Sequence, residues 1–305
     1  MANSRNIPAP QKPKFSLAIQ TPSMQNLIRN TLGDADTAKR FIAAISSAVG
    51  TTPALQECDA GSIITGALLG ESLKLSHFPQ VGHYYLVPFK NRKDGTTRAV
   101  FVPGYKGYIQ LATRSGYYKK LTVMEVKEGE LIKYNPFEDE AEFSYIEDYN
   151  QREAAPTIGY FAMFKYTDKA GGMKKVLYWT KEKMLDHADK YSQAFSRDVY
   201  AKILAGQIPD KDMWKYSSFW YKNFDEMAKK TMIRQLISKW GYMSIETQTA
   251  FESDNHTIVQ NDDGFFVPES TTNDADVIRD VITAPTNNAV AIDVDDDDGD
   301  LFEDD

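Results

Sequence analysis

The sequence predicts an α+β fold in which antiparallel strands pack with helices into a compact core. Apolar residues recur at helical spacing in several segments, and runs of aromatic and β-branched residues flank turn sequences. Hydrophobic residues make up 42% of the 305 residues, which is enough to bury one sizeable core or two small ones.

Residues 1–35 are predicted to form an N-terminal arm. The first 22 residues contain four prolines among polar residues, which disfavours regular structure and indicates an extended segment able to reach a neighbouring subunit.

Two helices are predicted after the arm. Asp36 and Thr37 can cap the start of the first, and apolar residues then follow at helical spacing as far as Val49. A second helix is predicted over residues 62–75, where small residues allow close packing in the interior.

Strands and helices are then predicted in succession. Aromatic and β-branched residues indicate strands over residues 83–89 and 98–102, joined by a hairpin turn at Asp94-Gly95. A helix is predicted over residues 105–115, with Gly116 after its end. The same patterns predict strands over residues 117–126, 143–146, 157–166 and 174–179, and helices over residues 181–191 and 219–240, with Gly241 ending the last.

Charge is distributed unevenly along the chain. Residues 251–305 contain 17 acidic residues and one arginine, a net charge of −16, which leaves residues 1–250 at +8. A basic body with an acidic end points towards nucleic acid or another polyanion, although +8 is also compatible with an ordinary protein surface. We therefore predict a core over residues 36–250 and a disordered acidic tail over residues 251–305. Three roles for this tail are left open: it keeps the chain soluble, it competes with DNA for the basic groove, or it docks a partner through Leu301 and Phe302.

Several classes of protein are disfavoured. No apolar run is long enough to span a membrane, and no hydrophobic block follows the first charged residues, so we expect a cytosolic protein. The single cysteine, Cys58, cannot form an internal disulfide, and the four histidines lack zinc spacing. We expect no metal or other cofactor.

The segment Gly104-Tyr105-Lys106-Gly107-Tyr108 opens the helix predicted over residues 105–115. A helix N-terminus flanked by glycines exposes backbone N–H groups that can hold a phosphate, and the interleaved basic and aromatic residues suit a groove for single-stranded nucleic acid. The alternative is a glycine-bounded turn whose tyrosines belong to the core. The candidate DNA contacts from this region are Tyr105, Lys106, Tyr108, Arg114, Lys119 and Lys120.

The helix predicted over residues 219–240 carries the second group of candidates. Its apolar residues step by four along one stripe, while Lys230 and Arg234 occupy a different face with Lys229 beside them. We expect the apolar stripe to dock and the basic face to remain free for DNA. The alternative is a solvated basic face over an aromatic core.

Signals for an enzyme are weaker. The ATP-binding pattern Gly-x-x-x-x-Gly-Lys-Ser/Thr is absent. Glu125-Val126-Lys127 matches half of a metal-dependent nuclease site, but the other half has to come from acids such as Asp139 or Glu142 at no diagnostic spacing. An ordinary strand face is therefore favoured over a nuclease.

Three motifs occur in a fixed order along residues 60–240. They are His83-Tyr84-Tyr85-Leu86-Val87-Pro88-Phe89, then Gly104-Tyr105-Lys106-Gly107-Tyr108-Ile109 with Leu111-Ala112-Thr113-Arg114-Ser115-Gly116, and finally Glu226-Met227-Ala228-Lys229-Lys230-Thr231-Met232-Ile233-Arg234. In order and spacing they resemble the RecT family of phage-encoded single-strand annealing recombinases.

The resemblance implies an oligomer, a ring or a helical filament, that binds single-stranded DNA without ATP or metal. It implies pairing of a strand left by a partner exonuclease with its complement through an annealed duplex intermediate, with no covalent chemistry. A host single-strand-binding protein is a further candidate partner, and a passive coating protein, which would slow annealing, is the alternative function. The DNA-facing residues that the resemblance implies are Lys106, Arg114, Lys229, Lys230 and Arg234.

Overall fold

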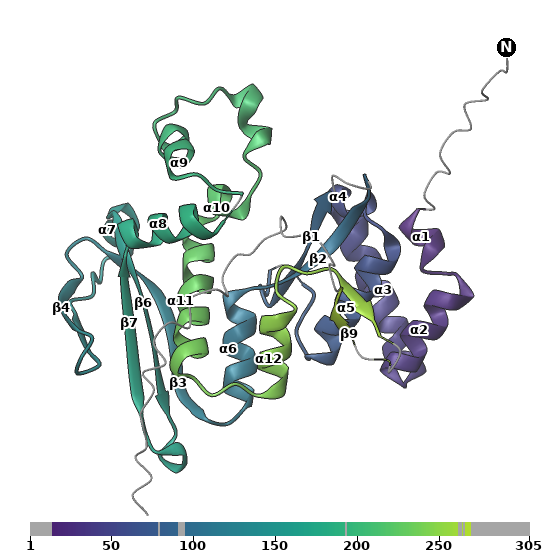
Figure 1. Ribbon diagram of the computed structural model, residues 1–305, viewed down its shortest axis with the longest axis horizontal. Helices are drawn as coiled ribbons and strands as arrows, with labels where there is room; N and C mark the ends of the chain where they lie inside the picture. Colours follow the sequence, from purple (N-terminus) through teal and green to yellow (C-terminus); the bar gives the residue numbers. More distant parts are fainter. Residues whose placement is uncertain are drawn as a thin grey trace, which may run out of the picture.

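The computed structural model describes residues 14–78, 80–90, 95–192, 194–261, 264 and 266–269. The fold is α+β, as predicted, with antiparallel strands packed against helices. A larger buried cluster of apolar residues surrounds helices α6 (Tyr105–Arg114) and α11 (Phe224–Trp240), and a smaller one lies among the N-terminal helices. Figure 1 shows these two parts side by side.

The N-terminal part consists of helices α1 (Phe15–Ala18), α2 (Pro22–Leu32), α3 (Ala35–Thr51), α4 (Pro53–Gln56) and α5 (Ala60–Ser72). The predicted extended segment is therefore wrong for residues 15–22, and the rest of the predicted arm is helical as far as Leu32. Pro22 lies in the first turn of α2, where the N–H that proline lacks would have no helical partner. Phe15, Ile19 and Ile28 are buried in the smaller cluster, and residues 1–13 lie outside the described ranges.

Helix α3 begins two residues earlier than predicted. Asp34 caps it, because its carboxylate accepts a hydrogen bond of 2.7 Å from the backbone N–H of Thr37. The predicted apolar face is confirmed, since Phe41 and Ile45 are buried. Helix α5 is packed in the interior, as its small residues predicted.

The predicted hairpin forms from β1 (Tyr84–Lys90) and β2 (Thr97–Pro103), with Val87 opposite Val100. It connects the two buried clusters, because Ala99 packs in the smaller one and Phe101 in the larger one. Residues 91–94 of the connecting loop, which include Asp94 of the predicted turn, lie outside the described ranges.

Strands β3 (Tyr118–Lys127), β6 (Thr157–Tyr166) and β7 (Lys174–Thr180) form an antiparallel sheet in the order β3-β6-β7. The inner face contributes Tyr160 and Phe164 to the larger cluster, beside α6 and α11. The outer face carries Phe161 and Val176, which pack with the hairpin of β4 (Leu131–Asn135) and β5 (Glu140–Phe143). The strand predicted over residues 143–146 was misplaced, because the pairing of β4 with β5 ends at Phe143.

The helix predicted over residues 219–240 is interrupted. Asn223, with φ of −139° and ψ of 55°, separates α10 (Phe219–Lys222) from α11, and Gly241 follows the end of α11 as predicted. In the view of Figure 1, α9 stands above α8, and α10 lies beside α8 at the upper end of α11. The remaining elements in this half are α7 (Tyr149–Ala154), η1 (Asp168–Ala170), α8 (Lys181–Tyr191), α9 (Arg197–Leu204) and η2 (Asp210–Lys215).

The folded core extends further towards the C-terminus than predicted. It includes α12 (Ile245–Glu252), β8 (Ile258–Gln260) and β9 (Phe266–Pro268), and Phe251 and Ile258 are buried in the larger cluster. The prediction that the tail starts at residue 251 is therefore wrong for residues 251–260. The predicted disorder and the acidic residues beyond residue 269 lie outside the described ranges. Within those ranges, no helix has both the length and the apolar character needed to cross a membrane.

We expect His187 to make the fold sensitive to acid. Its ring lies 5.2 Å from that of Trp179 and 4.6 Å from that of Tyr191, and burial together with nearby lysines, Lys239 foremost, lowers the pKa of His187 from 6.5 to about 4. The unfolded chain binds a proton below pH 6.5 while the folded protein does not, so stability is complete above pH 6.5 and is lost as the pH falls towards 4. The shift corresponds to roughly 2 to 3 kcal/mol.

Urea unfolding at pH 7 and pH 4.5 measures this effect. A His187→Phe variant keeps a ring in the same place without a titrating nitrogen, so it is expected to lose less stability on acidification than the unsubstituted protein. Equal losses in the two proteins would show that other groups control the acid sensitivity.

Candidate nucleic-acid interface

The N-terminus of α6 lies directly against the chain that enters β1, and two glycines make this approach possible. The backbone N–H of Gly104 donates to the carbonyl oxygen of His83 at 2.9 Å. A Cβ atom at Gly107 would lie 2.1 Å from that same oxygen, and one at Gly104 would lie 2.3 Å from the carbonyl oxygen of Gly82. The predicted glycine-flanked helix start is confirmed, and its glycines bring the helix onto the backbone of residues 82–83.

Rings and lysines from three parts of the chain meet at this helix start. We call this group the α6 entrance cluster: Tyr85, Tyr105, Lys106, Phe219 and Lys229. The ammonium nitrogen of Lys229 lies 5.1 Å from the centre of the Tyr105 ring, that of Lys106 lies 5.9 Å from it, and the Tyr85 and Phe219 rings are 6.1 Å apart. Burial raises the pKa of Tyr105, and burial together with Glu226 and Tyr105 raises the pKa of Tyr85, so both rings stay neutral.

The two lysines of the α6 entrance cluster differ in their surroundings. The Lys229 ammonium lies 2.6 Å from Glu226 and 3.2 Å from Glu125. Burial is the largest single influence and lowers the pKa of Lys229, but Glu226, Tyr105 and Glu125 together outweigh it, so the pKa is raised. Lys106 is exposed and has no ion pair with any described residue. Lys106 is therefore better placed than Lys229 to meet a phosphate.

Three other predicted contacts, Tyr108, Lys230 and Arg234, lie in the interior. They surround Asp254, whose carboxylate is 2.8 Å from the Lys230 ammonium, accepts a hydrogen bond of 3.0 Å from the Tyr108 hydroxyl, and is ion-paired with Arg234. The Arg234 guanidinium also donates to the Tyr108 hydroxyl at 2.5 Å. Exposed fractions are 0% for Tyr108, 5% for Lys230 and 2% for Arg234. We call these four residues the Asp254 cluster.

The prediction that Lys230 and Arg234 form a free basic face is therefore wrong. Helix α11 is buried on nearly all sides from Lys230 to Ile237, because α6 and the sheet pack around it and Asp254 reaches it from the loop after α12. Asp254 was missed because it lies in the segment assigned to the acidic tail. The signal that pointed to it was the position of Lys230 and Arg234 among the apolar residues of α11, since buried charges are found paired.

The remaining candidates lie at the other end of α6, about 15 Å from the entrance for a ten-residue helix. Arg114 donates to the backbone carbonyls of Leu73 and Lys74, at 2.5 and 3.2 Å, and so joins α6 to the end of α5. Lys119 lies 3.6 Å from Asp168, and Lys120 is exposed on β3. The nine predicted contacts are thus divided among the α6 entrance cluster, the Asp254 cluster and this far end.

The acids weighed for a nuclease are not brought together. Glu125 lies between two lysines, 3.2 Å from Lys229 and 3.5 Å from Lys127. Asp139 accepts hydrogen bonds from Lys175 and from the backbone N–H of Val176 on β7, which is two strands away from β3.

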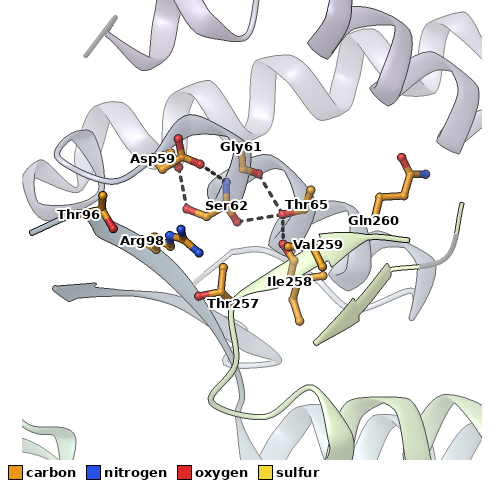
Figure 2. Close-up of a pocket in the computed structure, with 10 residues that line it drawn as sticks. All are labelled: Asp59, Gly61, Ser62, Thr65, Thr96, Arg98, Thr257, Ile258, Val259 and Gln260. Atoms are coloured by element: carbon orange, nitrogen blue, oxygen red, sulfur yellow. Dashed lines mark hydrogen bonds between the residues drawn. The ribbon is translucent and has the colours of Figure 1, made fainter. Parts of the chain in front are cut away.

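A cavity of about 450 Å³ lies between α5, β2 and β8. Figure 2 shows hydrogen bonds among some of its lining residues: Asp59 accepts from the Ser62 N–H, and the Thr65 hydroxyl donates to the Ile258 carbonyl. Arg98, which also lines it, forms an ion pair with Glu269. These bonds hold β8 against α5 and Glu269 against β2, which is a structural role.

Comparisons with known proteins agree with the motifs. The model of the RecT family matches residues 39–266. The chain is 31% identical over 285 residues to the uncharacterized protein YqaK of Bacillus subtilis (strain 168), covering 93% of this chain and 84% of that protein. It is 30% identical over 238 residues to the protein RecT of Escherichia coli (strain K12), covering 77% of this chain and 78% of that protein. The chain therefore belongs to the RecT family, the family of single-strand annealing recombinases that its three motifs resemble.

Proposed function

We propose that this protein binds single-stranded DNA at the α6 entrance cluster and anneals complementary strands without ATP, metal or covalent chemistry. The observation that carries the proposal is the half-buried Tyr105 ring with the ammonium groups of Lys106 and Lys229 near it. This ring lies at a helix N-terminus whose two glycines allow it to pack against the chain that enters β1. Aromatic faces stack on any base, and lysines beside them follow the phosphate backbone.

The chemistry of the α6 entrance cluster suits annealing. Tyr105 and its neighbouring rings hold bases by their faces, which leaves the pairing edges open to a second strand. Lys106 and the first N–H groups of α6 hold a phosphate, and neutralised phosphates repel an incoming strand less. Tyr108, Lys230 and Arg234 act indirectly in this proposal, by fixing α6 against α11.

Contacts at one such cluster are weak, so the proposal includes a homo-oligomer, a ring or a filament, that sums them along the strand. A partner exonuclease supplies the single strand, a host single-strand-binding protein is a further candidate partner, and the protein acts in the cytosol. Arg114, Lys119 and Lys120 are proposed to extend the phosphate contacts beyond the entrance.

The test is the rate at which two complementary oligonucleotides pair, with and without the protein, in buffer containing EDTA and no ATP. We expect acceleration by the protein. Tyr105→Ala is expected to weaken binding of single-stranded DNA roughly 5- to 150-fold, from a loss of about 1 to 3 kcal/mol of stacking per base.

Tyr105→Phe is the matched control, because it keeps the ring and removes only the hydroxyl. It is expected to bind DNA like the unsubstituted protein. Binding without acceleration of pairing would favour a passive coating protein, and equal affinities of the Ala and Phe variants would remove Tyr105 from the DNA site.

A further inference from the structure

We infer that the outer face of the sheet binds the phosphate backbone of a second DNA strand, separately from the α6 entrance cluster. This inference rests on the proposed function. It is carried by three lysines that lie side by side across all three strands: Lys120 on β3 is paired with Lys165 on β6, which is paired with Lys174 on β7. We call these residues the lysine row.

The lysine row points away from the helices. Residues paired across neighbouring strands share a face of the sheet, and Lys165 alternates with Phe164, which packs in the larger cluster on the inner face. All three lysines are exposed, and none forms an ion pair with another described residue. The row therefore presents three ammonium groups to solvent on one surface.

Folding alone does not account for this arrangement. Neighbouring strands lie about 4.8 Å apart, and like charges directly opposite each other destabilise a sheet. Lysines on edge strands commonly prevent unwanted strand pairing, but Lys165 lies on β6, the central strand, where no edge needs protection. A polyanion that contacts all three lysines removes their mutual repulsion.

The rest of the outer face agrees with a DNA backbone as the occupant. The next positions in register are Thr122, Met163 and Val176, followed by Met124, Phe161 and Tyr178. None of these outward positions is acidic. Among the acids of the adjoining turns, Asp139 is bonded to Lys175 and the Val176 N–H, and Asp168 lies 3.6 Å from Lys119. The outward side chains in register with the row are therefore neutral.

The lysine row and the α6 entrance cluster lie on opposite sides of the sheet. Glu125, on β3, belongs to the inner side, where it contacts Lys229 of the entrance cluster. A DNA strand bound at the entrance cluster therefore leaves the lysine row unoccupied, and a second strand bound at the row is held on the same protein molecule at high local concentration. Such a surface raises the rate of encounter between two strands that otherwise repel each other.

The experiment loads the full-length protein with one oligonucleotide and then measures binding of a second, non-complementary, labelled oligonucleotide to that complex. In the variant K120Q/K165Q/K174Q we expect capture of the second strand to weaken about tenfold and to depend less on salt. Affinity for the first strand is expected to stay within about twofold, and the pairing rate of complementary strands to fall with capture. K120R/K165R/K174R, which keeps the charge, is expected to retain capture.

The matched control removes three charges elsewhere, in the variant K14Q/K39Q/R40Q on the N-terminal helices, and is expected to capture the second strand normally. The lysine-row glutamine variant should melt at the same or a higher temperature, because repulsion is removed. The inference would be overturned if the glutamine variant captured the second strand as well as the control variant does. It would also be overturned if the glutamine variant lost as much affinity for the first strand as for the second. A protein that captures two strands but does not speed their pairing would instead contradict the proposed function.

Discussion

Replacing Asp254 with alanine is expected to lower the free energy of unfolding by about 3 to 5 kcal/mol, the typical result of removing one partner from a buried ion pair. Asp254 is the carboxylate that both Lys230 and Arg234 contact, and all three side chains are at most 6% exposed. Without it, two cations and the Tyr108 hydroxyl lose their common acceptor in a place where water does not replace it.

Lys230→Met is the control that separates the loss of charge balance in the Asp254 cluster from the loss of side-chain packing. It removes one cation and keeps an unbranched side chain of similar volume, so Asp254 remains paired with Arg234. We expect a loss less than half that of Asp254→Ala in equilibrium urea unfolding. If Lys230→Met destabilises as much as Asp254→Ala, the Asp254 cluster is held by packing and not by charge balance.

The Asp254 cluster also changes the expected effect of substituting Lys230 and Arg234 on α11. Lys230→Ala with Arg234→Ala is expected to reduce DNA binding because α6 loses its support, and the reduction should accompany lower thermal stability. Lys106→Gln, by contrast, should weaken binding and flatten its salt dependence without changing stability, because Lys106 is exposed.

Local patterns in the sequence were sufficient to predict most of the helices and strands. The β1–β2 hairpin, the helix start at Gly104 and the strands β6 and β7 depend on neighbouring residues, and each was predicted within a few positions. Helices α1 and α2 were missed because prolines were taken to exclude regular structure, whereas Pro22 begins a helix.

The candidate site was predicted less completely, because burial is not a local property. A lysine at helical spacing away from an apolar stripe has the same pattern whether solvent or another segment covers it. Arg234 and Lys106 therefore looked equivalent in the sequence, although Arg234 is 2% exposed and Lys106 is exposed. The lysine row depends on strand register, which was not predicted, so only Lys120 was named from it.

Gly107→Ala is expected to lower the free energy of unfolding by about 3 kcal/mol, the upper end of the usual range for overpacking. The added methyl group would lie 2.1 Å from the carbonyl oxygen of His83, a backbone atom that no rotamer change can move. Either α6 or the start of β1 has to shift, and the gain of about 1 kcal/mol from alanine in a helix does not offset this.

Gly50→Ala is the matched control, since Gly50 also lies in a helix, α3, but has no atom within 4 Å of the added Cβ. It is expected to stabilise the protein by about 0.5 to 1 kcal/mol. Because a shift of α6 also displaces Tyr105 and Lys106, Gly107→Ala should weaken binding of single-stranded DNA even at temperatures where it is fully folded, whereas Gly50→Ala should not. Normal DNA affinity in a folded Gly107→Ala protein would mean that the position of the α6 N-terminus does not matter for binding, and the DNA site would then have to lie elsewhere on the protein.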